Sequence, residues 1–208
     1  MSYNGSLAIT ISRLKNSNHE YPMDALTALH TRNSVNLLIE PAPNREQLEN
    51  IIQAGLKACD HGRLRPWKYL IIEGEARNAF GELMASVKGK LDGRPLTEEN
   101  FEKFKNKAFR APMIIAVVAS ITEHPKVPEI EQLLSAGASA QMMMTAAHAQ
   151  GIGAIWRSGS LMFDEMMHEG LGLNANDKLV GFIYLGTIKA AKPLTTLDSN
   201  YFIEFWKG

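Results

Sequence analysis

The sequence predicts a single globular domain in which helices and β-strands are mixed. The chain has 208 residues, of which 45% are apolar and 21% are charged, and this composition is enough to bury one sizeable core. Several segments carry apolar residues at helical spacing, whereas residues 67–72 are rich in β-forming side chains and residues 113–119 form an uninterrupted apolar run. Runs of these two kinds are typical of strands, and we expect both to be central strands of a sheet.

Helices are expected where capping residues precede periodic apolar residues. Asn44 can cap a helix that runs to about Ala58, with Gln47 reaching back to complete a capping box. Thr97 can cap a second helix, because acidic residues follow it in the first turn. The remaining predicted elements are helices over 23–31, 75–88, 97–108 and 128–150, a helix near 163–168, and short strands over 153–156 and 179–185.

The longest predicted helix, over 128–150, has very small side chains in its middle. Residues 135–140 are all Ser, Ala or Gly, so another helix can approach closely. Gly and Ser have low helix propensity, so we expect tight packing to stabilise this part of the helix. The tail over 201–206 is strongly apolar, so we expect it to pack on something, such as a second subunit. Residues 1–22 are expected to form an extension that precedes a domain over 23–208.

Charge and cysteine content exclude several classes of function. Lys and Arg total 22, as do Asp and Glu, so no net charge favours nucleic acid or an anionic membrane. The single cysteine, Cys59, excludes an intramolecular disulfide and fits a reducing compartment. No apolar run reaches the length of a transmembrane helix, and we expect a soluble, cytoplasmic protein. Asp60 and His61 are adjacent but lack supporting ligands at metal-binding spacing, so no metal site is expected.

Two short motifs carry chemistry. Arg32-Asn33-Ser34 places a guanidinium, an amide and a hydroxyl where the first helix ends, which suits a phosphate; the alternative is a polar helix end. Trp156-Arg157-Ser158-Gly159 follows a short strand, and a tryptophan beside an arginine and small residues can form the flat, donor-lined wall that a flavin ring requires. The alternative, a helix stop followed by a strand, explains Gly151 but not this motif. No Gly-x-Ser-x-Gly elbow, Walker loop or cysteine pair is present.

In their order and spacing, a series of segments resembles the nitroreductase family, with the closest likeness to its compact YdjA-like branch. The likeness spans roughly residues 23–190. The segments that carry it are Met23-Asp24-Ala25-Leu26, Arg32-Asn33-Ser34, Asp60-His61 to Pro66-Trp67, Phe109-Arg110-Ala111-Pro112, Lys126-Val127-Pro128, Ser135-Ala136-Gly137, Ala149-Gln150-Gly151 and Trp156-Arg157-Ser158-Gly159.

The resemblance implies an α+β, nitroreductase-like fold, with a mixed, mainly antiparallel sheet in a three-layer α-β-α arrangement. It also implies a homodimer with FMN at the subunit interface. The cofactor-binding residues that it implies are Arg32, Asn33, Ser34, Lys57, His61, Trp156, Arg157 and Ser158. It places the nicotinamide donor near Ala146, Ala147, His148, Ala149, Gln150 and Gly151. Asn33 and Asn36 stand where the family commonly has basic residues, and Lys57 stands where the branch has an arginine.

The implied activity is a ping-pong oxidoreductase reaction. Electrons pass from NAD(P)H through bound FMN to a nitroaromatic, a quinone or a similar electron-poor acceptor, and no protein side chain is required as a catalytic acid or base. The departures at Asn33 and Asn36 keep a second hypothesis open, a flavin-binding or flavin-storage protein without turnover. A structural module without a cofactor is the third.

Overall fold

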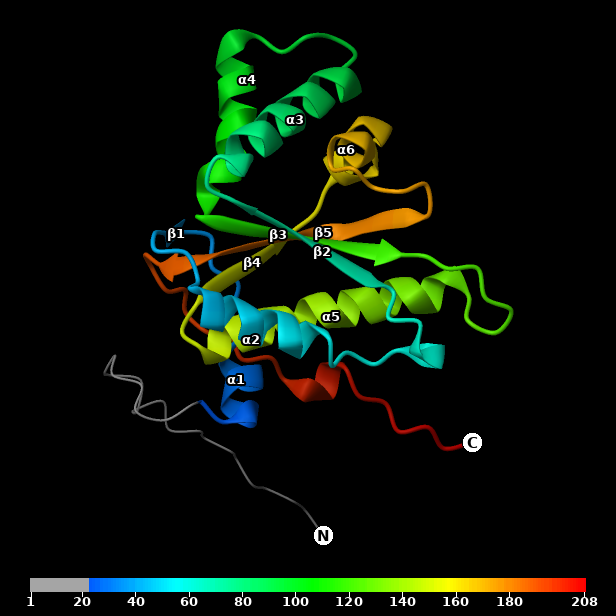
Figure 1. The fold of residues 1–208 in the computed structure, drawn as a ribbon. Coiled ribbons are helices and arrows are strands. Elements are labelled where there is room, and N and C mark those ends of the chain that lie inside the picture. Colours follow the sequence, from blue (N-terminus) through cyan, green and yellow to red (C-terminus); the bar gives the residue numbers. More distant parts are fainter. Residues whose placement is uncertain (1–22) are drawn as a thin grey trace.

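The computed structural model describes residues 23–208, and the predicted extension over 1–22 lies outside the described residues. A five-stranded sheet lies between two groups of helices (Figure 1), which confirms the predicted α+β class. The strands are β1 (Leu38–Ile39), β2 (Trp67–Glu73), β3 (Met113–Ser120), β4 (Gly153–Arg157) and β5 (Asp177–Ile188). The helices are α1 (Ala25–Thr31), α2 (Arg45–Gly55), α3 (Ala76–Leu91), α4 (Glu98–Lys105), α5 (Glu129–Ala149) and α6 (Glu165–Gly170), with short 3₁₀ turns η1 (His61–Arg63), η2 (Asn106–Arg110), η3 (Ser160–Phe163) and η4 (Ser199–Tyr201).

Strand β5 is the centre of the sheet. It pairs with β3 along one edge and with β4 along the other, and its last residues also pair with β1. Each of the described pairings is antiparallel. Our expectation of two central strands is correct for β3 but wrong for β2, which pairs only with β3 in the described chain. Residues 113–119 of β3 are all buried, whereas Ile71 of β2 is 38% exposed, as an edge position allows.

The sheet has a core on each face. Helices α3, α4 and α6 lie on one side, and α1, α2 and α5 lie on the other (Figure 1). Side chains alternate along β5: Phe182 and Tyr184 join the cluster under α3, while Ile183 and Leu185 join the cluster under α5. Burying a side chain of this size contributes about 1.5–3 kcal/mol, so each layer is held by several such contributions.

Helix α5 packs closely through its small residues, as the sequence predicts. Ser135, Ala136, Ser139 and Ala140 are buried, and α2 crosses them at Gly55. A Cβ atom at Gly55 would lie 2.8 Å from Met143 Cγ and 2.9 Å from Ser139 Oγ. The close approach therefore depends on a glycine in α2 as well as on the small residues of α5.

The capping residues define several helix starts correctly. Asn44 and Gln47 form the predicted capping box, and the Thr97 side chain accepts from the Asn100 N–H. Helix α2 ends at Gly55, somewhat before the expected Ala58, because the chain turns at Leu56. Among residues 23–208, no helix has both the length and the apolar character needed to cross a membrane.

Two glycines of α3 test the packing of the helical hairpin α3–α4. At Gly81 a Cβ atom would lie 2.5 Å from the Lys105 carbonyl oxygen, whereas at Gly89 it would lie 3.5 Å from the Arg94 carbonyl oxygen. Gly→Ala in a helix contributes about 1 kcal/mol of stability where the space exists. We expect Gly89→Ala to be stabilising. Gly81→Ala should be destabilising, because displacing backbone costs roughly 1–3 kcal/mol.

The measurement is the free energy of unfolding in urea for the two variants. Both substitutions make the same chemical change in the same helix, so helix propensity affects them alike. Opposite signs of the change in the free energy of unfolding would therefore report the difference in packing. Equal shifts for the two variants would contradict the described contact between α3 and Lys105.

Candidate functional site

Arg32 follows α1 and carries a buried donor that has no hydrogen-bond partner among residues 23–208. Its backbone N–H caps the helix by donating to the Ala28 carbonyl at 3.1 Å, and the Val35 N–H donates to the Ala154 carbonyl of β4 at 2.9 Å. These bonds fix the segment between α1 and the sheet. Arg32 Nη1 is buried and makes no hydrogen bond within the described chain. A buried, unsatisfied guanidinium donor is costly, and an anion such as a phosphate would satisfy it.

His148, near the end of α5, lies beside Arg32. The Thr31 hydroxyl donates its proton to the Thr27 carbonyl at 2.6 Å and lies 2.8 Å from His148 Nε2. Because a hydroxyl has one proton, His148 Nε2 must be the donor in the second contact. Burial, and secondarily the charge of Arg32, lower the pKa of His148 below its ordinary value of 6.5. Both effects favour a neutral imidazole. Thr31 was not identified in the sequence, although it directly precedes the Arg32-Asn33-Ser34 motif.

The last turn of α5 is held firmly next to this cluster. Gln150 Nε2 donates to the Ala146 carbonyl at 3.1 Å and to the Gln47 carbonyl at 3.3 Å. Gly151 then turns the chain with a φ of +73°, a conformation that suits glycine. The structure thus brings segment 146–151, expected near the nicotinamide donor, to the same end of α5 as Arg32.

The other two residues of the motif differ from Arg32 in their contacts. Asn33 Nδ2 donates to the Pro193 carbonyl at 3.1 Å, so this amide ties down the chain that leaves β5. Ser34 is partly buried. Arg32 is therefore the residue of the motif with an unsatisfied buried donor.

Lys57 and His61 lie elsewhere in the fold. Both are exposed, and His61 Nδ1 lies 2.5 Å from the Glu131 carboxylate in the first turn of α5. Asp60, which precedes His61, accepts a hydrogen bond from the Arg65 N–H at 2.7 Å. Within residues 23–208 no group of three or more metal-binding side chains occurs.

Helix α5 separates these two groups of predicted cofactor-binding residues. Glu131, beside His61, is in its first turn, and His148, beside Arg32, is in its last. At about 1.5 Å of rise per residue, Glu131 and His148 are separated by roughly 25 Å along the helix axis. One chain therefore does not bring Arg32 and His61 together around a single small ligand.

Trp156 and Arg157 face opposite sides of the sheet. Trp156 packs in the layer under α5, where its ring lies against Gly137 and Gly181. The Arg157 guanidinium lies 5.4 Å from the centre of the Tyr184 ring, in the other layer. Successive residues of a strand alternate in this way. The single wall expected from Trp156-Arg157-Ser158 is thus divided, with Trp156 on the α5 side and Ser158 exposed beyond the end of β4.

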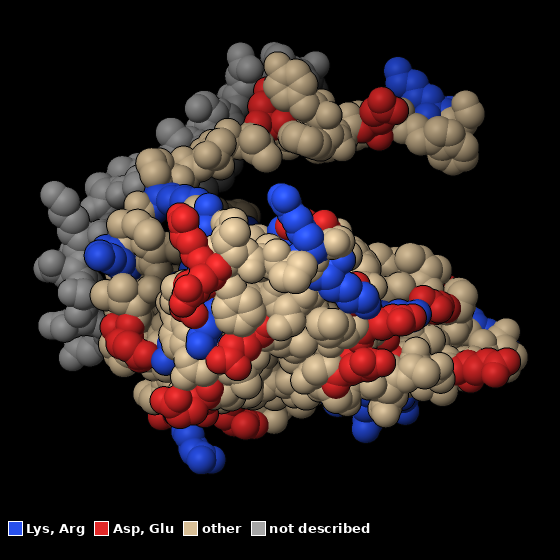
Figure 2. Space-filling view, turned by 90° about the horizontal axis from the view of Figure 1, so that it is seen from above, with Lys and Arg blue, Asp and Glu red and all other residues tan. Residues whose placement is uncertain are grey.

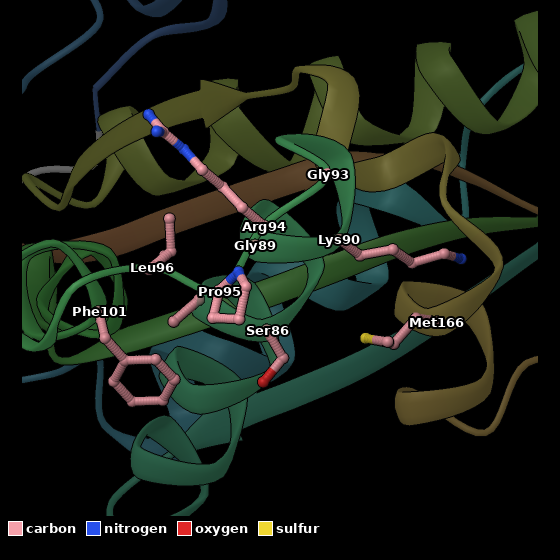
Figure 3. Close-up of a pocket in the computed structure, with 10 residues that line it drawn as sticks. Ser86, Gly89, Lys90, Gly93, Arg94, Pro95, Leu96, Phe101 and Met166 are labelled. Atoms are coloured by element: carbon pink, nitrogen blue, oxygen red, sulfur yellow. The ribbon is translucent and has the colours of Figure 1, made fainter.

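A hollow of about 500 Å³ lies between α3, α4 and α6. Figure 3 shows Lys90 and Arg94 extending away from its centre, and Lys90 pairs with Asp164 at 2.8 Å. None of the predicted cofactor-binding residues lines this hollow. Its lining is mostly apolar and carries no group that would perform the expected chemistry.

Comparison with known proteins places this geometry in context. The family model described as "Nitroreductase family" matches residues 31–187. The chain is 42% identical over 188 residues to "Putative NAD(P)H nitroreductase YdjA" of Escherichia coli K12, which covers 88% of this chain and all of the relative. It is 39% identical to "Putative NAD(P)H nitroreductase" of Haemophilus influenzae, with the same coverage.

Solved structures share the fold. A nitroreductase-like family protein from Bacillus cereus superposes with a TM-score of 0.76 at 20% identity, over 89% of this chain and 97% of that one. A "putative nitroreductase" of Desulfovibrio desulfuricans, solved in complex with FMN, gives a TM-score of 0.67 at 20% identity, over 88% of this chain and 96% of that one.

The lowered pKa of His148 predicts a pH dependence of stability. As the pH falls through 6.5, the unfolded chain takes up a proton at this residue before the native chain does, so the free energy of unfolding should decrease. His148→Gln should remove this part of the decrease. Urea unfolding at pH 7.5 and 5.5, at one protein concentration, measures it. His30→Gln, an exposed change on α1, is the control, and an unchanged pH slope in His148→Gln would contradict the assignment.

Proposed function

The chain belongs to the nitroreductase family of oxidoreductases, and we propose that it passes electrons from NAD(P)H through bound FMN to a nitroaromatic, a quinone or a similar electron-poor acceptor. The observation that carries the proposal is the buried Arg32 donor, which has no hydrogen-bond partner among residues 23–208 and lies next to the segment expected to face the nicotinamide donor. The names of the relatives, which specify NAD(P)H, and the FMN-bound neighbour support the same chemistry.

Arg32 would hold the FMN phosphate, with Ser34 on the ribityl chain and Asn33 beside them. When bound, FMN supplies the two-electron chemistry, accepting hydride from the nicotinamide and releasing electrons to the acceptor. The indole of Trp156 and the exposed Ser158 would border the isoalloxazine ring. In this proposal Arg157 contributes its backbone there, since its side chain points to the other face. Lys57 and His61 would complete the site.

We propose that the two halves of the site come from different subunits of a homodimer. The separation along α5 keeps His61 away from Arg32 in one chain. A twofold dimer with the two α5 helices antiparallel would place the His61 end of one subunit at the Arg32 end of the other. Each dimer would then hold two equivalent FMN molecules at the interface.

Exposed apolar side chains support such an interface. Ile130 and Leu134 of α5 are 60% and 66% exposed, and Leu26 and Leu29 of α1 are similarly open. The C-terminal segment stands clear of the body as an arm (Figure 2). The expectation that the tail packs on something is not met within one chain, because Trp206 is 93% exposed. A second subunit would cover these side chains.

A flavin-storage protein without turnover is the second candidate, favoured by Asn33 and Asn36 in place of basic residues. Anaerobic mixing of the FMN-loaded protein with NADH or NADPH separates the two. An enzyme should bleach and then recover its flavin absorbance when menadione or nitrofurazone is added. A protein that does not bleach, or bleaches without recovering, would contradict the proposed turnover.

Arg32→Ala tests the phosphate assignment. Loss of a charge-assisted contact to an anion costs about 1.5–3 kcal/mol, so we expect FMN to bind about ten- to a hundredfold more weakly. Quenching of FMN fluorescence gives the dissociation constant. Arg45→Ala, an exposed change in the first turn of α2, is the matched control. If Arg32→Ala bound FMN as tightly as Arg45→Ala, the assignment would be wrong.

A further inference from the structure

We propose that a cavity on the α3 side of the sheet, which borders the proposed flavin site at β4, binds a small aromatic carboxylate. The cavity has a volume of about 360 Å³ and lies between strands β4 and β5, helix α3, and the turns η2 and η3. Lys107, Arg110 and Arg157 line it together with Tyr184. Trp156 and Ser158, which belong to the proposed flavin site, also line this cavity, whereas Arg32, Ser34, Lys57 and His61 do not.

The cations of this cavity lack carboxylate partners. None of the ion pairs formed within residues 23–208 includes Lys107, Arg110 or Arg157. Arg157 Nε is moreover buried without a hydrogen-bond partner in that part of the chain. An anion would stabilise these three neighbouring positive groups, of which Lys107 also lies 3.4 Å from the centre of the Phe104 ring.

The electrostatic interactions in the cavity also favour a bound anion. Burial, and then the charge of Arg110, lower the pKa of both Lys107 and Arg157. Burial raises the pKa of Tyr184 to about 12, so its hydroxyl stays protonated and can donate. The three cations repel one another, and a bound anion would relieve this repulsion while accepting hydrogen bonds.

The rest of the lining defines the body of the ligand. Met84, Met162 and Phe182 are buried apolar residues of the cavity wall, and Phe182 also packs on Phe80 at 5.1 Å between ring centres. Methionine and aromatic side chains form adaptable surfaces for flat apolar groups. A carboxylate at the cationic side with an aromatic body against this wall satisfies both parts of the lining.

Titration calorimetry with 2-naphthoate on the full chain in the presence of FMN tests the proposal. We expect saturable binding of 2-naphthoate, at least tenfold weaker binding of the neutral 2-naphthamide, and weaker binding of inorganic phosphate, which lacks the apolar body. Arg110→Gln and Lys107→Gln should each weaken 2-naphthoate binding at least fivefold. The FMN dissociation constant should not change in either variant.

The control is Arg94→Gln, an exposed change of the same charge, which should bind 2-naphthoate as the parent does. Thermal melts establish that each variant is folded, and having two independent variants keeps the test valid if one of them is not. Equal binding of 2-naphthoate and 2-naphthamide would overturn the proposal. So would 2-naphthoate binding that survives in both folded variants, because the ligand would then occupy another site, such as the proposed flavin site.

Discussion

Helix α5 packs on the sheet through Ser, Ala and Met side chains, and this contact fixes the geometry on which the proposed site depends. Because the helix is 21 residues long, it holds Arg32 near one end and His61 near the other. Its close packing leaves Ile130 and Leu134 on the outer face, open to a second subunit. The same element therefore separates the two groups within one chain and offers the apolar surface through which two chains can bring them together.

The alternation of side chains along β4 divides the chemistry between two faces of the sheet. Trp156 belongs to the layer of α5, and Arg157 belongs to the layer of α3. The Arg32 part of the proposed flavin site lies on the α5 side, and the cavity with Lys107, Arg110 and Arg157 lies on the α3 side and borders that site at Trp156 and Ser158. Since the two residues are adjacent in β4, ligands bound on the two faces would be neighbours across this strand.

Local signals in the sequence predict the helices and strands well, whereas they do not predict which strands pair with one another. The capping residues Asn44 and Thr97 define helix starts, and the continuous apolar run of β3 marks a fully buried strand. The edge position of β2 depends on which strands meet in space, and the two-residue strand β1 is too short to leave a pattern. Family resemblance identifies the candidate site residues. The contact of Thr31 with His148 arises from the packing of α1 on α5, which no local motif encodes.

The most direct test of the shared flavin site is complementation between two defective homodimers. Arg32→Ala removes one half of each site, and the double variant Lys57→Ala/His61→Ala removes the other. Subunits exchanged at equal concentration should form mixed dimers in which one of the two sites is intact, so FMN binding should recover to about a quarter of all sites. Native mass spectrometry counts the mixed dimers, and FMN fluorescence counts the sites. Mixed dimers that recover no FMN binding would contradict a site built from two subunits.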